Sequence, residues 1–138
     1  MKVAYDKGAF PIGRAHDADA GYDIRTPIDF TVPGNGYYTV DTGVHIEIPR
    51  GYVGVLQSKS GLNVKYGLTG TGTIDSGFMG SIRVKLYNHH VEAHKFEKGD
   101  KIIQIVFYPI FTPELETVSI SDFEETERGN QGFGSSGK

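Results

Sequence analysis

Residues 70–82 read Gly-Thr-Gly-Thr-Ile-Asp-Ser-Gly-Phe-Met-Gly-Ser-Ile, and the rest of the chain is organised around this stretch. Four glycines surround one carboxylate, Asp75, and one aromatic ring, Phe78. Glycine permits positive φ and lets a flat ligand come close to the main chain. Two strand-like pieces around Ser76-Gly77 predict a β-hairpin whose backbone could bind a planar polar group. A plain β-turn with an aspartate at its bend is the simpler interpretation of this stretch alone.

The composition is that of an ordinary globular chain with many turns. The 138 residues suit one domain, and 38% hydrophobic with 22% charged residues are usual values. Nineteen glycines without a collagen-like period indicate many tight turns. A formal net charge of −3 argues against a nucleic-acid partner. It leaves room for a small phosphate ligand, because a few local cations and backbone N–H groups can bind one.

The chain contains no cysteine, which excludes disulfides, zinc–thiolate sites and a cysteine nucleophile. Residues 1–10 lack an apolar signal region, and no run approaches the ~18 residues that span a membrane. We therefore expect a cytoplasmic protein with no membrane partner.

Short strands and turns recur at roughly ten-residue spacing, with almost no helix, which predicts an all-β fold: a β-sandwich, jelly roll or barrel. Asn35-Gly36 predicts a hairpin, and residues 63–66 could form one helical turn. The expected strands are residues 2–5, a strand from Tyr22, 44–48, 52–57, 82–87, 101–108 and 115–120.

The strand predicted at 101–108 carries apolar residues on both faces. A strand of a small sandwich needs this when one face packs on another subunit, or when the strand is fully buried in its own chain. The pattern suggests oligomerisation, but a buried strand would look the same. One face carries Ile103, Ile105 and Phe107, and the other carries Ile102, Val106 and Tyr108.

Residues 58–61 read Ser-Lys-Ser-Gly and place one cation between two hydroxyls. Lys59 supplies charge, Ser60 supplies a hydroxyl, and N–H groups near Gly61 point outward, which suits a phosphate. The Walker A spacing is absent, and an exposed turn with a solvated lysine is the simpler interpretation of these residues alone.

The C-terminal residues 128–138 are rich in glycine and too flexible to fold alone. Arg128 can clamp a phosphate, and Phe133 can stack on a base, although a disordered terminus explains the same residues. We expect a β domain over residues 1–120 and a flexible C-terminal arm over residues 121–138.

Residues 89–94 read His-His-Val-Glu-Ala-His and raise the question of a metal site. The spacing does not match His-Glu-x-x-His, and the residues follow a predicted strand rather than lying on a helix. We favour a surface loop with solvated histidines.

Five segments together resemble the five motifs of the homotrimeric deoxyuridine triphosphatases (dUTPases). One short match carries little weight, but five in the family's order and at its spacing are specific. The segments are residues 19–24 (Asp-Ala-Gly-Tyr-Asp-Ile), 58–62 (Ser-Lys-Ser-Gly-Leu), 72–80 (Gly-Thr-Ile-Asp-Ser-Gly-Phe-Met-Gly), 99–104 (Gly-Asp-Lys-Ile-Ile-Gln) and 128–137, with Arg128-Gly129 and Gly132 to Gly137.

The resemblance implies a β-jelly-roll subunit, in agreement with the strand pattern, and a homotrimer with shared active sites. It implies hydrolysis of dUTP to dUMP and pyrophosphate with Mg²⁺, which lowers uracil incorporation into DNA and supplies dUMP for thymidylate synthesis. Asp75 would activate the water that attacks the α-phosphorus. Triphosphate oxygens and waters would hold most of the Mg²⁺ shell, with Asp23 in the outer shell, which suits a sequence without a carboxylate cage.

The same resemblance assigns substrate contacts, and closure of the arm would exclude other water. The implied substrate-binding residues are Lys59, Ser60, Gly61 and Gln104 for the phosphates, the backbone of Gly72, Thr73 and Ile74 for uracil, Phe78 against the deoxyribose where a 2′-OH would clash, Arg83 as a cation near substrate, Arg128 on phosphate, Phe133 stacked on uracil, and Gly134, Ser135 and Ser136 over the γ-phosphate.

Three positions depart from the family pattern. Phe78 replaces the usual tyrosine, so the ring remains without its hydroxyl. Lys59 replaces the usual arginine, which keeps the charge but loses the planar fork. Ser81 stands where a carboxylate or amide is common. We expect the first two changes to weaken affinity modestly and to leave the reaction intact.

Two other functions stay open from the sequence. A dCTP deaminase on the same fold would need a proton shuttle near the base, which Ser81 and Thr73 do not offer. A nucleotide-binding or protein-binding regulator that has kept the fold is disfavoured because Asp75, Arg128 and Phe133 are all in place. No residue of the sequence excludes an additional regulatory protein partner, whether the protein is an enzyme or a regulator.

Overall fold

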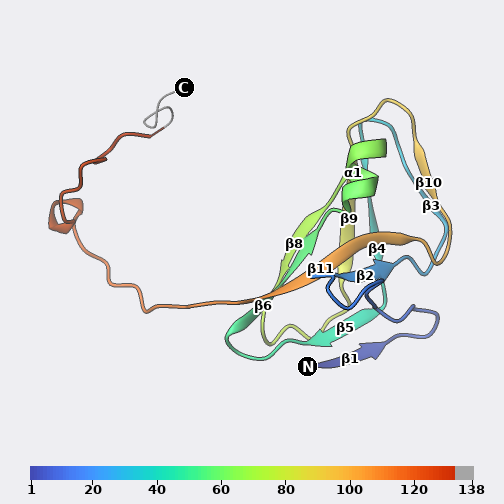
Figure 1. Ribbon diagram of the computed structural model, residues 1–138, viewed down its shortest axis with the longest axis horizontal. Coiled ribbons are helices and arrows are strands. Elements are labelled where there is room, and N and C mark those ends of the chain that lie inside the picture. Colours follow the sequence, from blue (N-terminus) through green and yellow to red (C-terminus); the bar gives the residue numbers. More distant parts are fainter. Residues whose placement is uncertain (133–138) are drawn as a thin grey trace.

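Antiparallel strands build almost all of the body in the computed structural model, which describes residues 1–132 (Figure 1). The all-β prediction is confirmed, and the predicted bounds 2–5 and 52–57 match those of the first and sixth strands. The strands are β1 (Lys2–Tyr5), β2 (Tyr22–Arg25), β3 (Phe30–Val32), β4 (Tyr37–Asp41), β5 (Val44–Glu47), β6 (Tyr52–Gln57), β7 (Leu68–Thr69), β8 (Thr71–Ile74), β9 (Arg83–Asn88), β10 (His94–Phe96) and β11 (Lys101–Pro109), together with the helix α1 (Ser60–Tyr66) and a 3₁₀ turn (Ile120–Asp122).

Strands distant in the sequence become neighbours in the sheets. The largest sheet has the order β2-β11-β6-β8, and a second sheet has the order β4-β9-β7. The remaining strands form the pairs β1-β5 and β10-β3. All of these pairings are antiparallel. This connectivity of crossing strands is that of a jelly-roll subunit.

The core lies between the sheets and is mainly aliphatic, with Phe30 and Phe96 as its aromatic members. On β9, Val84 and Leu86 are buried while Arg83 and Tyr87 are exposed, which confirms the alternation predicted there. Burying one such side chain contributes about 1.5–3 kcal/mol. Other members of the same cluster include Ile24, Val32, Val40, Val44, Leu56, Leu68, Ile82, Phe96 and Ile105.

Strand β11 is buried on both faces within one chain. Its pairing with β2 shifts register between Lys101 and Ile103, so one residue of β11 is unpaired and Ile102 and Ile103 are both fully buried. A β-bulge of this kind breaks strict alternation. The fully buried alternative therefore explains most of the doubly apolar pattern, and the pattern no longer argues for a second subunit.

Neither predicted hairpin forms as a pair of strands. Strand β8 pairs with β6, whereas β9 pairs with β4 and β7. Around Asn35-Gly36 the chain turns, with Asn35 at φ 51°, but β3 pairs with β10 and β4 pairs with β9. Both predictions are wrong for the same reason: turn residues specify where the chain bends, and burial of each strand's apolar face selects its partner.

Helix α1 begins three residues earlier than the single turn predicted at 63–66. Gly67 ends it in the left-handed region, at φ 60°, and donates its N–H to the carbonyl of Asn63. With seven residues α1 is short, and none of the helices within residues 1–132 has the length and apolarity to cross a membrane.

The chain leaves the body after β11 and continues as an extended arm (Figure 1). The N–H of Ile110 donates to Gly51, whereas the hydrogen bonds of the described residues 111–132 stay within the arm. The strand predicted at 115–120 is wrong: residues 115–119 are irregular and have no partner strand, and Ile120 begins the 3₁₀ turn. The division of the chain at residue 120 stays a prediction.

Candidate active site

An open pocket of about 400 Å³ lies where β2, β6 and β11 meet the loop before β2. Three of the five segments that resemble dUTPase motifs contribute to its wall, although they are far apart in the sequence. The lining residues are Ala15, His16, Asp19, Ala20, Gly21, Asp23, Gln57, Lys59, Lys101, Gln104, Val106 and Tyr108.

Asp23 is the central charge of this pocket. Its side chain is only 11% exposed, Lys59 forms an ion pair with Oδ1, and Nζ of Lys101 lies 2.7 Å from Oδ2. Burial by itself raises the pKa of Asp23, but hydrogen bonds from Lys101 and Lys59 outweigh it, so the pKa lies below its usual 3.8. These three side chains together carry one net positive charge, which suits an anionic ligand, and Asp19 is the other carboxylate on the pocket wall.

Gln104 and Gly21 form a close contact on the pocket wall. The Gln104 amide nitrogen donates to the carbonyl of Ser58 at 3.3 Å, which links β11 to the segment before α1. A Cβ added at Gly21 would overlap the side-chain oxygen of Gln104. Glycine is therefore required at position 21 for Gln104 to keep this orientation.

Residues 58–61 connect β6 to α1 at one end of the pocket. The hydroxyl of Ser58 donates to the carbonyl of Gly70 (3.1 Å) and accepts from its N–H (2.9 Å), which fixes this turn against the body. Ser60 and Gly61 follow Lys59 at the start of α1, and a Cβ added at Gly61 would meet open space. The structure thus brings Lys59 to Asp23 and Ser58 to Gln104, whereas Ser60 and Gly61 do not line the pocket.

Asp75 and Phe78 lie on a turn outside this pocket. The N–H of Phe78 donates to the carbonyl of Asp75 (3.2 Å), and Gly77 has φ 90°, as a glycine-dependent β-turn requires. Both side chains are exposed, and the Phe78 ring packs on Gly80, where an added Cβ would come within 2.6 Å of it. The plain-turn interpretation of this stretch is correct for the backbone.

The pairing of β6 with β8 separates Asp75 from Lys59. Thr71 lies opposite Gln57 and Ile74 lies opposite Gly54, so Asp75 comes at the start of β6 and Lys59 just beyond its end. At about 3.3 Å per residue, this separation is about 20 Å. One chain therefore does not bring the predicted catalytic aspartate to the predicted phosphate-binding lysine.

The uracil-binding backbone predicted at Gly72, Thr73 and Ile74 lies on β8, an edge strand. In its sheet β8 pairs with β6 alone, so its other edge is open to a ligand or another strand. An added Cβ at Gly72 would lie 3.2 Å from Leu56, so the glycine also lets β8 pack closely on β6.

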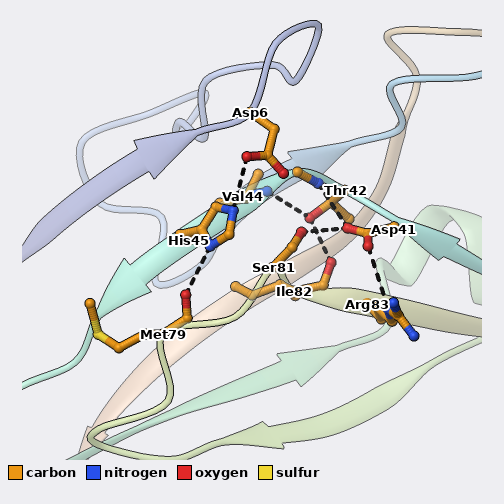
Figure 2. A network of polar contacts seen from close by, with 10 residues as sticks. Asp6, Asp41, Thr42, Val44, His45, Met79, Ser81, Ile82 and Arg83 are labelled. Atoms are coloured by element: carbon orange, nitrogen blue, oxygen red, sulfur yellow. Dashed lines mark hydrogen bonds and ion pairs between the residues drawn. The ribbon is translucent and has the colours of Figure 1, made fainter.

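Arg83 and Ser81 meet at Asp41 (Figure 2). The Arg83 side chain is 74% exposed, and its Nε donates to Asp41 at 3.4 Å, while the Ser81 hydroxyl donates to the other carboxylate oxygen. The Ser81 hydrogen bond is the main reason that the pKa of Asp41 is lowered, against a smaller opposing effect of burial. In this chain Ser81 thus ties the loop to β4.

Arg128 lies on the arm, where its Nε donates to the carbonyl of Gln131 at 3.0 Å. The arm leads away from the body of the chain (Figure 1). Phe133, Gly134, Ser135 and Ser136 lie outside the described residues.

The histidine-rich loop makes local contacts. The Nε2 of His89 lies 2.8 Å from the Thr69 hydroxyl, and the His94 ring packs at a tilt of 47° against Tyr66, with ring centroids 4.6 Å apart. Burial lowers the pKa of His94. Within residues 1–132, no three His, Cys, Asp or Glu side chains are grouped as a metal site.

The sequence-based predictions give no role to Lys101 or to Arg14. Lys101 belongs to the fourth motif-like segment, but only the folded structure shows that its side chain reaches Asp23. Arg14 organises the loop before β2 by donating to the carbonyls of Asp17 (2.7 Å) and Asp19 (3.2 Å). The closeness of Arg14 to Asp17 and Asp19 in the sequence is the pattern that indicates an ordered loop here.

Comparison with known proteins agrees with these segments. The dUTPase family model matches residues 10–137. A deoxyuridine 5'-triphosphate nucleotidohydrolase of Yarrowia lipolytica is 43% identical over 139 residues, covering 99% of this chain and 88% of that protein. The protein of the same name from Paramecium bursaria Chlorella virus 1 is 39% identical over 125 residues, covering 90% and 87%.

Solved structures give the same result. The dUTPase of Staphylococcus bacteriophage 80alpha with dUpNHpp superimposes with a TM-score of 0.89 at 33% identity, covering 99% of this chain and 98% of that one. A variant dUTPase of phage phi11, described as coordinating a structural Mg(II) ion, gives 0.79 at 29% identity, covering 88% and 98%. The chain therefore belongs to the dUTPase family of nucleotide hydrolases.

Proposed function

We propose that this protein hydrolyses dUTP to dUMP and pyrophosphate in active sites shared between copies of the chain. The observation that carries the proposal is the separation of the motif residues. Lys59 and Gln104 line one pocket with Asp23, whereas Asp75 lies about 20 Å along β6. A second copy that presents its Asp75 turn to this pocket completes the site, and a homotrimer closes such a contact by symmetry.

The pocket binds the triphosphate. Lys59 transfers from Asp23 to a phosphate oxygen, and Lys101 remains on Asp23 and keeps that carboxylate compensated. The Gln104 amide and the hydroxyl of Ser60, with the backbone of Gly61, add polar contacts. These interactions hold the α-phosphorus in line for attack.

Asp75 of the neighbouring copy orients a water and takes its proton as the oxygen attacks the α-phosphorus. The exposed carboxylate on a glycine-supported turn is free to reach across an interface. General-base catalysis of this kind typically contributes 10²–10⁴-fold, and the pyrophosphate leaves with the electron pair of the broken P–O bond.

Uracil is bound by the open edge of β8, where Gly72, Thr73 and Ile74 offer backbone donors and acceptors. The exposed ring of Phe78 packs on the deoxyribose and leaves no room for a ribose 2′-OH. Arg83, held by Asp41, gives positive charge near this turn.

The donor set suits Mg²⁺ that arrives with the triphosphate. Residues 1–132 contain no cage of three ligating side chains, and Asp23 offers one carboxylate beside the phosphate-binding lysine. Because Mg²⁺ keeps several waters, Asp23 would act through such a water rather than as a direct ligand. When bound, the ion neutralises developing charge on the phosphates.

The arm closes the site of another copy. It exposes large apolar side chains, including Phe111 (87%), Leu115 (91%) and Ile120 (78%), which stay in water unless a second chain covers them. Arg128 then pairs with phosphate and Phe133 stacks on uracil, with Gly134, Ser135 and Ser136 over the γ-phosphate. In a cytoplasmic setting, the reaction lowers uracil incorporation into DNA and supplies dUMP for thymidylate synthesis.

The test is pyrophosphate release in the presence of Mg²⁺, with dUTP, dTTP, UTP and dCTP compared at equal concentration. Turnover of dUTP alone supports the uracil edge, the sugar-excluding ring and the hydrolytic role together. Release of ammonia from dCTP would instead identify a deaminase. Restoring the family arginine with Lys59→Arg should lower KM, and an unchanged or higher KM would contradict the role given to Lys59.

A regulatory function is the second candidate. The 80alpha enzyme is described as one of the phage dUTPases that control transfer of virulence genes by a G protein-like mechanism. Tight binding of dUTP without pyrophosphate release by the folded protein would favour this function over hydrolysis.

A further inference from the structure

His45, on β5, bridges two segments that are distant in the sequence (Figure 2). Its Nδ1 lies 2.9 Å from the carbonyl oxygen of Met79, and its Nε2 lies 3.2 Å from Oδ1 of Asp6. Met79 follows Phe78 on the turn that carries Asp75, and Asp6 follows the N-terminal strand β1.

Both partners of the imidazole are hydrogen-bond acceptors. A neutral imidazole has one N–H and serves one of them, whereas the imidazolium has two N–H groups, donates one to Met79 and pairs by charge with Asp6. Nε2 is shielded from solvent, and its angle to Asp6 is poor for a hydrogen bond, so this contact is an ion pair when the ring is charged. The geometry therefore favours the protonated ring.

The bridge that His45 forms between Met79 and Asp6 contacts the middle of the loop of residues 75–82, where few other hydrogen bonds hold the chain. The loop's far end is held firmly, because Ile82 donates to Val44 (2.8 Å) and accepts from the Thr42 hydroxyl (2.7 Å). In the described part of the chain, residues 76–80 receive one hydrogen bond from a side chain, and it joins His45 to the carbonyl of Met79. Loss of this bond frees the segment next to Phe78.

We propose that His45 is a proton-dependent positioning residue, whose imidazolium fixes the turn that presents Asp75 and Phe78 to the substrate. The inference rests on the proposed dUTP hydrolysis for its effect on turnover, but the bridge itself does not. His45 touches neither substrate nor the reacting atoms; it acts through the backbone of Met79.

The charges around His45 favour this state. The Met79 carbonyl, then the Asp6 carboxylate, raise the pKa of His45 above its usual 6.5, and Asp41 acts in the same direction against the effect of burial. On the facing strand β1, the uncharged Ala4 lies opposite His45. The charged residues within β1 and β5 are Lys2 and Glu47, which form an ion pair with each other. Because the folded-state pKa is raised, the bridge is complete below 6.5 and is lost as pH rises through the folded-state value.

The test combines imidazole NMR titration with amide hydrogen exchange of residues 75–82 in the ligand-free protein, from about pH 5.5 to about 8.5. Protection factors are compared, because they remove the intrinsic pH dependence of exchange. The variants are His45→Gln and Asp6→Asn. Glu47→Gln is the matched control, since it removes a carboxylate two residues along the same strand that does not contact His45.

We expect protection of residues 76–80 to fall about tenfold as His45 deprotonates. Asp6→Asn should move this transition to lower pH, His45→Gln should abolish it, and Glu47→Gln should leave it in place. The KM for dUTP should rise several-fold across the same transition with kcat changed less, because fewer copies hold the competent turn.

Native protection that does not change as His45 titrates, which a neutral ring with its proton on Nδ1 would give, would overturn the inference. Protection that is unchanged in His45→Gln, or a His45 titration that Asp6→Asn does not move, would overturn it as well. If His45→Gln does not fold, Asp6→Asn still tests the inference, because this variant keeps the imidazole of His45. A His45-dependent transition in a protein that does not hydrolyse dUTP would support the bridge and contradict only the proposed reaction.

Discussion

Nζ of Lys101 lies 2.7 Å from one carboxylate oxygen of Asp23, and Lys59 holds the other. Lys59, at the N-cap of α1, and Lys101, on β11, thus share one partly buried charge. In the proposed reaction Lys59 moves to a phosphate and Lys101 is the cation that stays on Asp23. The proposal therefore predicts a role in binding for Lys101 as well as for Lys59.

Lys101→Met should therefore raise the KM for dUTP about tenfold, equivalent to about 1.4 kcal/mol. With Lys101 gone, Lys59 is the sole cation on Asp23 and moves less readily to phosphate. The free energy of unfolding should fall by about 2 kcal/mol, since a charged hydrogen bond is lost. Lys101→Arg should behave almost as the native chain, and equal losses in both variants would contradict the charge argument.

Acid should destabilise the native protein more than an Asp23→Asn variant. The pKa of Asp23 is lowered in the folded state, so its stabilising effect is present above its usual 3.8 and is lost as pH falls through the lower folded-state value. Chemical unfolding between about pH 5 and about pH 2 measures this. Parallel pH dependence in the two proteins would show that other carboxylates dominate.

Asp75→Asn should reduce kcat by about 10²–10⁴-fold while leaving the dissociation constant of dUTP nearly unchanged. The amide keeps the shape of the turn but cannot accept the proton from water. Pyrophosphate release and calorimetric titration separate the two effects. Glu92→Gln, which changes a distant exposed carboxylate, should have full activity; a large loss of dUTP affinity in Asp75→Asn would argue for a binding role.

Two inactive variants should restore activity when mixed. If Asp75 and Lys59 of one site come from different chains, unfolding and refolding Asp75→Asn with Lys59→Ala in equal amounts leaves about a quarter of the sites intact. Each variant refolded alone is the control. No recovery in a mixture that forms mixed oligomers would place both residues of a site on one chain.

A chain that ends at residue 127 should lose activity but keep its stability. The hydrogen bonds of residues 111–132 lie within the arm, so removing Arg128 and the residues after it leaves the body unchanged. We expect kcat/KM to fall about 100-fold, because the site no longer closes, with Tm nearly unchanged. Full activity of the shortened chain would remove the arm from the mechanism.

Sequence periodicity and motif order predicted much of this protein. The alternation of Ile82, Val84 and Leu86 places apolar side chains on one face, and the structure buries all three. Tyr52–Gln57 was found with its correct bounds. These predictions succeed because side-chain alternation in a strand is a local property.

The partners of these strands could not be predicted in the same way. Asn35-Gly36 bends the chain as expected, yet the strands on its two sides pair elsewhere. Nothing near Lys101 in the sequence shows that it faces Asp23, since an antiparallel register brings them together. Arg83 likewise finds Asp41 through the pairing of β4 with β9.

By itself, the sequence determined the all-β class, the family and the residue types that its chemistry needs, because these depend on local periodicity and on motifs read in order. The tertiary structure decided that Asp23 shares two lysines, that Asp75 lies at the far end of β6 from Lys59, and that His45 reaches Met79. These relationships depend on long-range pairing and on burial, which are selected by the packing of the whole chain and are not encoded in any single stretch.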